Sequence, residues 1–235
     1  MRRLVIGLAA LCAAGGASAQ TAIGEMADIV RQVSGSFGGR TVALRNTDRV
    51  VQNEVLATGA DSMARVAFHD LTSVSMGPQA TIKLDRFVYN PDSTASQVTL
   101  GMAKGAFRFV TGSTKSENFR IRTPQATIGV RGTVVDIWVR PGREIVVLRQ
   151  GSAWACKGAA CVNIVQPDTG VIITAAGIQG PTPMATAEFN FDVFTLNRFT
   201  LYRHPALGNP LGGNGDTQAG YSSSSSSSSS STSRQ

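Results

Sequence analysis

Between residues 29 and 174 the apolar side chains recur at every second position. In Arg65–His69 they alternate with polar ones, and Arg108 lies between two phenylalanines. A period of two is typical of β-strands that bury one face and expose the other to water. The apolar runs are short and are separated by Gly, Pro, Asn and Asp. The sequence therefore predicts an all-β domain, built as a twisted antiparallel sandwich or a solenoid-like stack of short strands.

Two later runs, Val134–Val139 and Ile145–Leu148, are apolar on nearly both faces. Such runs indicate central strands that are covered on each side. Between them stands Pro141-Gly142, a strong turn signal. We therefore predict that the two runs form a hairpin.

The N-terminus has the three parts of a secretory signal peptide. Basic Met1-Arg2-Arg3 is followed by the apolar run Leu4–Ala14 and by the small residues Ala17-Ser18-Ala19. The apolar run is much shorter than the roughly 20 residues that a spanning helix needs. We expect cleavage near Ala19, a periplasmic or secreted mature protein, and no transmembrane segment in it.

The rest of the chain divides by composition. After the signal peptide (1–19) we expect a short lead-in (20–28), the all-β domain (29–180), a helix packed on that domain (181–203) and a disordered Gly/Ser-rich tail (204–235). The helix is favoured by apolar residues at helical spacing, although Phe189, Phe191 and Val193 also alternate as in a strand. The tail contains the serine run Ser222–Ser231, to which we assign no chemistry.

Cys156 and Cys161 are the cysteines that remain after the expected cleavage. An even pair in an oxidising compartment favours a disulfide. A metal site would need further soft ligands, and the histidines, His69 and His204, are far away in the sequence. We therefore predict a disulfide, no metal and no cofactor.

Composition and motifs argue against several functions. Cleavage would remove two of the 22 basic residues and leave 20 against 15 acids, so the net charge falls from +7 to +5. An exported basic protein seldom meets nucleic acid, so we predict no such partner. The chain has neither a Gly-x-Ser-x-Gly nor a His-Glu-x-x-His motif. Asp136 and Glu144 are the nearest carboxylate pair, and we expect ordinary surface acids there. We predict no catalytic residue and no enzymatic activity.

One long motif carries a family resemblance. The run 123–133 reads TPQATIGVRGT and is similar to the TPxAxxGVRGT signature of FecR-type periplasmic domains, with matches at Thr123, Pro124, Ala126, Gly129, Val130, Arg131, Gly132 and Thr133. The resemblance extends to Leu56–Phe68 and Lys104–Gly112. The family usually has Asp-Gly after the earlier strand, but here Leu71 follows Asp70. Because Leu disfavours a positive φ, we expect a different or longer turn there.

The resemblance implies a non-enzymatic binding or signalling module of the cell envelope. FecR relatives relay signals from outer-membrane receptors to a sigma factor, often in iron uptake. The alternative is a structural or surface-associated protein that contacts anionic envelope polysaccharide. Basic residues predominate between Lys104 and Arg149, so we expect an envelope protein or an anionic envelope ligand as partner. The candidate contacts are Arg108, Arg120, Arg122 and Arg131.

Arg131 has two readings at this point. Its forked guanidinium either satisfies carbonyls or an acid such as Asp136, or binds a ligand carboxylate or phosphate. The sequence makes no prediction of the oligomeric state.

Overall fold

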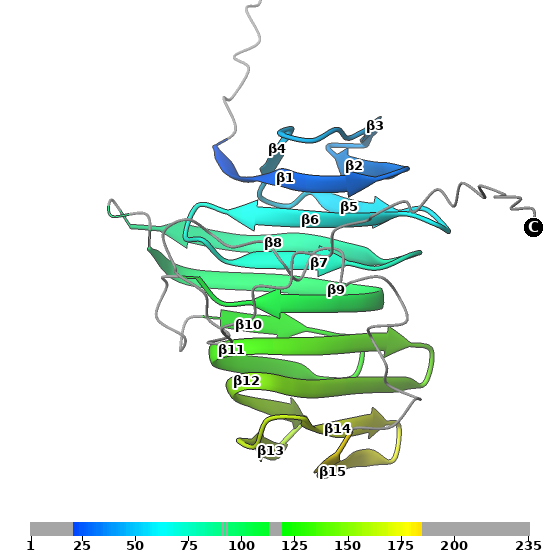
Figure 1. Ribbon diagram of the computed structural model, residues 1–235, viewed down its shortest axis with the longest axis vertical. Coiled ribbons are helices and arrows are strands. Elements are labelled where there is room, and N and C mark those ends of the chain that lie inside the picture. The colour runs from blue at the N-terminus through cyan, green and yellow to red at the C-terminus, as the bar shows by residue number, and fades with distance from the viewer. Residues whose placement is uncertain (1–20, 91, 93, 113–118, 185–235) are drawn as a thin grey trace, which may run out of the picture. The chain divides into compact units, whose positions relative to one another are not determined.

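The computed structural model describes residues 21–90, 92, 94–112 and 119–184. All regular secondary structure in these residues is β-strand, which confirms the all-β prediction. The strands stack in two facing layers, here called wall A and wall B, which three long strands join (Figure 1). Within the same residues, no helix has the length and apolar character needed to cross a membrane.

The strand pairings define the two walls. Wall A contains β2 (Val33–Phe37), β3 (Arg40–Ala43), β5 (Val55–Thr58), β8 (Thr81–Tyr89), β10 (Phe119–Arg122) and β13 (Ala160–Ile164). Wall B contains β1 (Ala22–Val30), β4 (Arg49–Val51), β6 (Met63–Phe68), β7 (Ser73–Met76), β14 (Thr169–Thr174) and β15 (Gly177–Pro183). The long strands β9 (Ala95–Val110), β11 (Thr127–Arg140) and β12 (Arg143–Lys157) belong to both. All these pairs are antiparallel except β9 with β10.

Each long strand changes wall at a bend. β9 pairs with β8 up to Lys104 and with β11 from Gly105 onward. β11 and β12 bend at Gly132 and Gly151, whose φ angles are 56° and 81°. The register between these two strands shifts at the same place. A bulge with a positive-φ glycine bends its strand, so the chain can run from one wall into the other without ending the strand.

The hydrophobic core lies between the walls. Phe68 on wall B packs against Phe87 on wall A, with ring centroids 4.8 Å apart. Phe109 on wall B meets Phe119 on wall A edge-on at 5.3 Å. Such aromatic pairs contribute about 0.5–1.5 kcal/mol beyond the area they bury. The alternating apolar residues thus face inward from both layers, and the polar residues between them face outward.

The β11–β12 hairpin has the predicted form. Arg140 pairs with Arg143 across the two-residue turn Pro141-Gly142. The strand after the turn is buried on both faces. Val146 and Leu148 point into the main core, while Ile145 and Val147 join a second apolar cluster with Met184 on the outer side of wall B.

The described strands extend beyond residues 29–180 at both ends of that range. β1 begins at Ala22, inside the expected lead-in, and β15 ends at Pro183. Residues 181–183 are therefore strand rather than the start of a helix. The remainder of the expected helix, the signal peptide and the Gly/Ser-rich tail lie outside the described residues.

The turn after β6 corrects one prediction. Leu71 adopts a φ of 68°, the conformation that we expected leucine to avoid. The reason is the fully buried Asp70, whose carboxylate accepts the N–H of Thr72 at 3.2 Å and its hydroxyl at 2.9 Å. The hydroxyl of Thr72 in turn accepts the N–H of Gly112 at 3.1 Å. These bonds fix the turn strongly enough to offset about 1–2 kcal/mol of left-handed strain.

Candidate functional site

The first half of the TPQATIGVRGT motif forms a closed turn between β10 and β11. The N–H of Thr123 donates to the carbonyl of Ala126 at 2.9 Å, and the N–H of Ala126 donates to the Thr123 hydroxyl at 3.0 Å. Pro124 is exposed and has no N–H that would need a partner. Ala126 is buried in the core. The turn therefore accounts for three of the motif's residues, Thr123 by its hydrogen bonds, Pro124 by its missing N–H and Ala126 by its burial.

Glu144 of β12 holds this turn from the interior. Its carboxylate accepts the hydroxyl of Thr123 and, at 2.9 Å, the N–H of Gln125. The residue is fully buried. Burial raises the pKa of Glu144 above its ordinary value, against the opposing effects of these hydrogen bonds and of Lys157. The expectation of a surface acid was wrong here, because the turn offers two donors that only an inward-facing acceptor can reach.

Glu144→Gln is expected to alter how stability depends on pH. Because the folded state raises this pKa above its ordinary 4.5, the folded state binds the proton more tightly than the unfolded state does. The contribution of Glu144 to the free energy of unfolding is therefore greatest below pH 4.5. It falls as the pH rises through the pKa of Glu144 in the folded state, and it is constant above that pKa. Urea unfolding across this range should show a smaller fall for the Gln variant, which cannot ionise.

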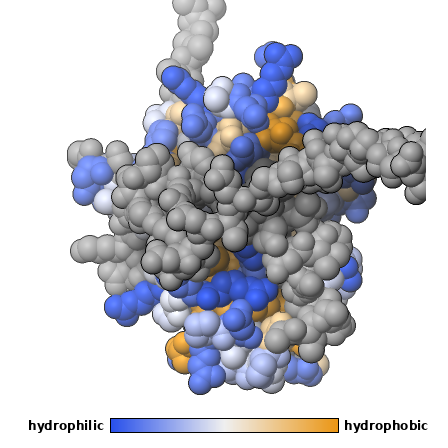
Figure 2. Space-filling model, in the orientation of Figure 1, coloured by the Kyte–Doolittle hydropathy of each residue, from blue (hydrophilic) through white to orange (hydrophobic). Residues whose placement is uncertain are grey.

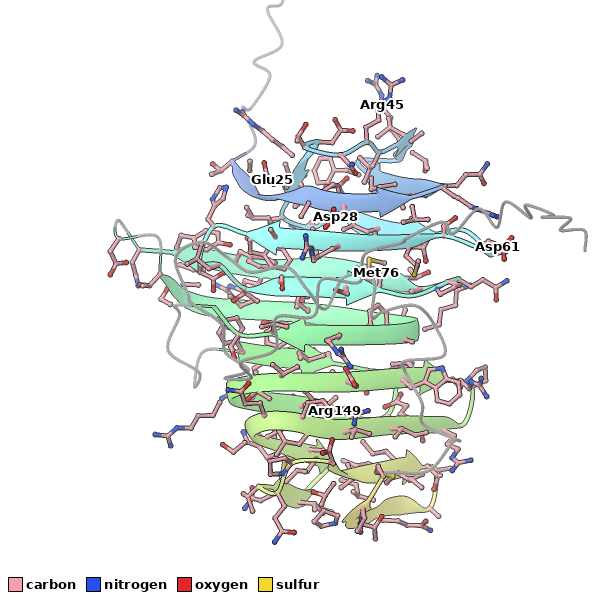
Figure 3. The ribbon with its side chains drawn as sticks, viewed as in Figure 1. Glu25, Asp28, Arg45, Asp61, Met76 and Arg149 are labelled. Atoms are coloured by element: carbon pink, nitrogen blue, oxygen red, sulfur yellow. A yellow bond between two sulfur atoms is a disulfide. The ribbon has the colours of Figure 1, made fainter. Side chains whose placement is uncertain are left out.

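Glu25→Gln, which changes an exposed carboxylate on β1, is the matched control and should follow the wild type (Figure 3). Glu144→Ala should instead cost about 1–3 kcal/mol at every pH, because it leaves the Gln125 N–H without its acceptor. Identical pH curves for wild type and Glu144→Gln would contradict the assignment.

The second half of the motif places one aromatic side chain against the outside of wall A. Ile128 and Val130 point into the core, so Gly129 between them faces outward. Gly129 pairs with Trp154 on β12. A Cβ at Gly129 would lie 2.1 Å from Cε2 of the indole. Glycine at this position thus lets the indole ring lie directly on the strand.

Thr133 ties the bend in β11 to its neighbours. Its hydroxyl accepts the N–H of Arg131 at 2.7 Å and donates to the carbonyl of Ser152 at 2.8 Å. The hydroxyl of Thr111 donates to the Thr133 carbonyl at 2.9 Å and accepts the Thr133 N–H. Threonine at this position therefore connects β11 with strands on both sides.

Arg131 faces outward from the same side of β11 as Gly129 and is exposed. Its guanidinium makes no hydrogen bond or ion pair with any residue that the structure describes. Asp136, the acid considered as its partner, is bound by Arg108 and Arg149 instead. The motif thus uses the backbone of Arg131 in the fold and leaves its charge at the surface.

The outward side of wall A gathers positive charge. Five basic side chains face outward from β8, β10 and β11, with Trp154 beside them, and Asp85 is the one acid of this surface within the described strands. We call this surface the outer basic face: Lys83, Arg86, Arg120, Arg122, Arg131 and Trp154. Asp85 lies 3.0 Å from Lys83 and 3.8 Å from Arg122. The surface therefore keeps a net positive charge, which favours an anionic partner.

The four predicted arginines do not share one face. Arg120 and Arg122 lie on β10 and Arg131 on β11, all on the outside of wall A. Arg108 lies on the part of β9 that pairs with β7 and β11, in wall B. There it forms a two-pronged ion pair with Asp136, at 2.6 and 2.8 Å. Sequence reasoning also missed Lys83 and Arg86, because they stand far upstream of the basic stretch.

The predicted disulfide is present and closes the hairpin beside this face. Cys156 on β12 pairs directly with Cys161 on β13 and is bonded to it. Thr127, the neighbour of Cys156 on the other side, belongs to β11. A loop this short contributes about 2 kcal/mol on the chain-entropy model. The bond thus supports the edge of the wall next to Trp154.

Comparison with known proteins finds one family match and two similar solved structures. Residues 54–153 match the family described as "FecR protein", and no curated protein matches the chain. Two crystal structures from Parabacteroides distasonis ATCC 8503, each named "putative anti-sigma factor", are similar, at 2.50 and 1.65 Å resolution. The sequence identities are 17% and 18%, the TM-score is 0.44 for both, and the match covers 55% of this chain and 60% of each of those chains. The matched family segment contains the whole TPQATIGVRGT motif and all five basic residues of the outer basic face. The similarity to the FecR family is therefore located at residues 54–153.

Proposed function

We propose that this protein is a non-enzymatic binding and signalling module of the cell envelope. It acts in the periplasm or after secretion, once the N-terminal leader has been removed. The match to the FecR family over residues 54–153 supports a regulatory role. The partner is an anionic protein surface or another anionic envelope component.

The observation that carries the proposal is the charge of the outer basic face. Five cations and one acid occupy a surface whose strands β8 to β12 lie side by side and pair within the wall. Arg122 is 66% exposed, and the Arg131 guanidinium is not used by the described fold. Charged groups left exposed in this way steer an oppositely charged partner and set its orientation.

Charge reversal combined with crosslinking in the native envelope tests the proposal. The variant Arg86→Glu/Arg122→Glu/Arg131→Glu should capture its partner at least tenfold less than the wild type, because it reverses three exposed charges of the face. Arg120 is left unchanged, since its guanidinium lies 5.2 Å from the centre of the Trp154 ring and its loss would disturb the indole.

A second triple variant controls for net charge. Arg40→Glu/Arg45→Glu/Arg49→Glu changes the total charge equally but alters exposed residues at the N-terminal end of the stack, where Arg45 lies (Figure 3). It should capture the same proteins as the wild type. If both variants lose capture equally, the effect is one of net charge and the face is not the site.

Arg131→Ala separates the two readings of that residue. Because the guanidinium is exposed, the free energy of unfolding should change by less than about 0.5 kcal/mol. Capture should fall while the fold is kept. A variant that unfolds would show instead that the side chain is structural.

A further inference from the structure

Trp154 lies in a row of side chains that crosses wall A at right angles to its strands. Arg86 pairs with Thr99, Thr99 pairs with Arg120, and Arg120 lies beside Gly129 because the next pair along is Ile121 with Ile128. Beyond Trp154 the row ends at Asn163 on β13. Neighbouring strands are about 4.8 Å apart. The two guanidinium groups and the indole come from every second strand, β8, β10 and β12, and the amide comes from the next strand, β13.

The indole is seated for a flat ligand. Gly129 has no side chain to lift the ring, since a Cβ there would lie within 2.3 Å of three of its atoms. The side chain is partly exposed. An aromatic ring that lies along a sheet presents a planar apolar surface. The planar Arg120 guanidinium lies over the ring, 5.2 Å from its centre, and donates one hydrogen bond to the Phe119 carbonyl at 2.8 Å. This combination suits a molecule that has both flat apolar faces and acidic groups.

A sugar ring that carries a carboxylate has both features. Its axial C–H groups form a flat apolar face that stacks on an indole, and its carboxylate accepts a forked pair of hydrogen bonds from arginine. A protein interface has a different composition, with an apolar centre of several large side chains. Among the large apolar side chains that are exposed in the described part of the chain, Val88 is the one on this face.

We propose that the outer basic face binds a single strand of a carboxylated polysaccharide. The strand lies across β8 to β13, with one sugar ring at Trp154 and carboxylates at the exposed Arg86 and Arg122. This inference rests on the proposed function, because it names the chemical class of partner for the same face. It also gives a reason for Gly129 in the motif, namely that any larger residue would displace the indole.

Calorimetric titration of the full chain with oligomers of polygalacturonate tests the inference. The wild type should bind, and the fully methyl-esterified oligomer, which lacks the charge, should bind at least tenfold more weakly. Trp154→Ala should weaken binding of the acidic oligomer about tenfold, while Trp154→Phe keeps a planar ring and should retain most of it. Trp138→Ala is the matched control, because Trp138 lies in wall B with the Arg140 guanidinium 3.5 Å from its ring centre.

Fluorescence provides a readout that does not depend on a destabilising variant. The chain has two tryptophans, so Trp138→Phe leaves Trp154 as the only indole. Adding polygalacturonate oligomers should shift or quench its emission. Unchanged emission at saturating oligomer would overturn the stacking arrangement.

Further probes separate failure of this inference from failure of the proposed function. Polyglutamate or single-stranded DNA that binds as tightly as polygalacturonate, with no loss in Trp154→Ala, would overturn the polysaccharide assignment and leave an anion-binding face in place. If Arg86→Glu/Arg122→Glu/Arg131→Glu neither weakens polygalacturonate binding nor lowers capture in the envelope, both proposals fail.

Discussion

Asp136→Ala is expected to lower the free energy of unfolding by about 3–5 kcal/mol, the usual cost of removing one partner from a buried ion pair. Asp136 is fully buried on β11, between Arg108 and Arg149. Its two carboxylate oxygens take three hydrogen bonds from these arginines, at 2.6, 2.8 and 2.8 Å. The side chains of the two arginines are 15% and 28% exposed, so neither charge can be rehydrated fully when the carboxylate is lost.

The position of Arg149 makes the cost larger. Burial alone would lower the pKa of Arg149, but hydrogen bonding and attraction from Asp136, with a further contribution from Asp168, raise it instead. The charge on this arginine is thus stabilised mainly by the acid that the substitution removes. Arg149 lies on β12 in the outer side of wall B (Figure 3), where the paired charges join β9, β11 and β12.

Asp168→Asn is the matched control for this prediction, because Asn tolerates the left-handed φ of 58° that Asp168 adopts. Asp168 also bonds Arg149, at 2.8 Å, but it is 66% exposed. Exposed pairs contribute roughly 0–1 kcal/mol, so the control should unfold close to the wild-type urea midpoint. Equal losses in the two variants would show that burial of Asp136 is not what makes the pair costly to break.

Much of this fold can be predicted from local patterns. The hairpin at Pro141-Gly142 follows from a turn dipeptide between two apolar runs, and the disulfide follows from an even pair of cysteines. Both features depend on residues that are close in the sequence, so no knowledge of the tertiary structure is needed. The hydrophobic residues that alternate along the chain are the ones that fill the core between the walls.

The candidate site could be predicted only in part, because alternation does not say which wall a residue occupies. Arg108 and Arg120 each stand between two apolar residues, and the pattern treats them alike. The bends in the long strands send them to opposite sides of the molecule.

Figure 2 shows one side, where hydrophilic residues surround smaller hydrophobic areas, including one at the β2–β3 end of the stack. Exposed Phe37 and Val42 belong to that hairpin.

The turn at Leu71 and the burial of Asp136 and Glu144 could not be predicted from the sequence, for one shared reason. Asp70, Asp136 and Glu144 are polar residues that sequence rules assign to the surface. Each is buried because hydrogen-bond donors reach its carboxylate inside the fold. These donors lie far away in the sequence, or in a turn whose shape the acid itself determines. Such donors become known only when the strands are assembled.

Gly151→Ala is expected to destabilise the protein by about 2–5 kcal/mol. The φ of 81° costs about 1–2 kcal/mol for a residue with a Cβ. The added Cβ would also lie 2.1 Å from the carbonyl oxygen of Gly132, and crowding of this kind costs a further 1–3 kcal/mol or so. Because the obstacle is backbone, relief requires β11 and β12 to separate where both strands change wall.

Gly132→Ala distinguishes the two causes, because Gly132 occupies the same bend on the neighbouring strand. Its φ is 56° and the site of its Cβ is empty to 4 Å, so this variant should lose only about 1–2 kcal/mol from backbone strain. Urea unfolding of both variants measures the difference. The bend that carries Arg131 would then depend on close contact at Gly151 and on conformation alone at Gly132. Equal losses would mean that the two strands can move apart at little cost, and the close approach of the strands would not be what holds the outer basic face in position.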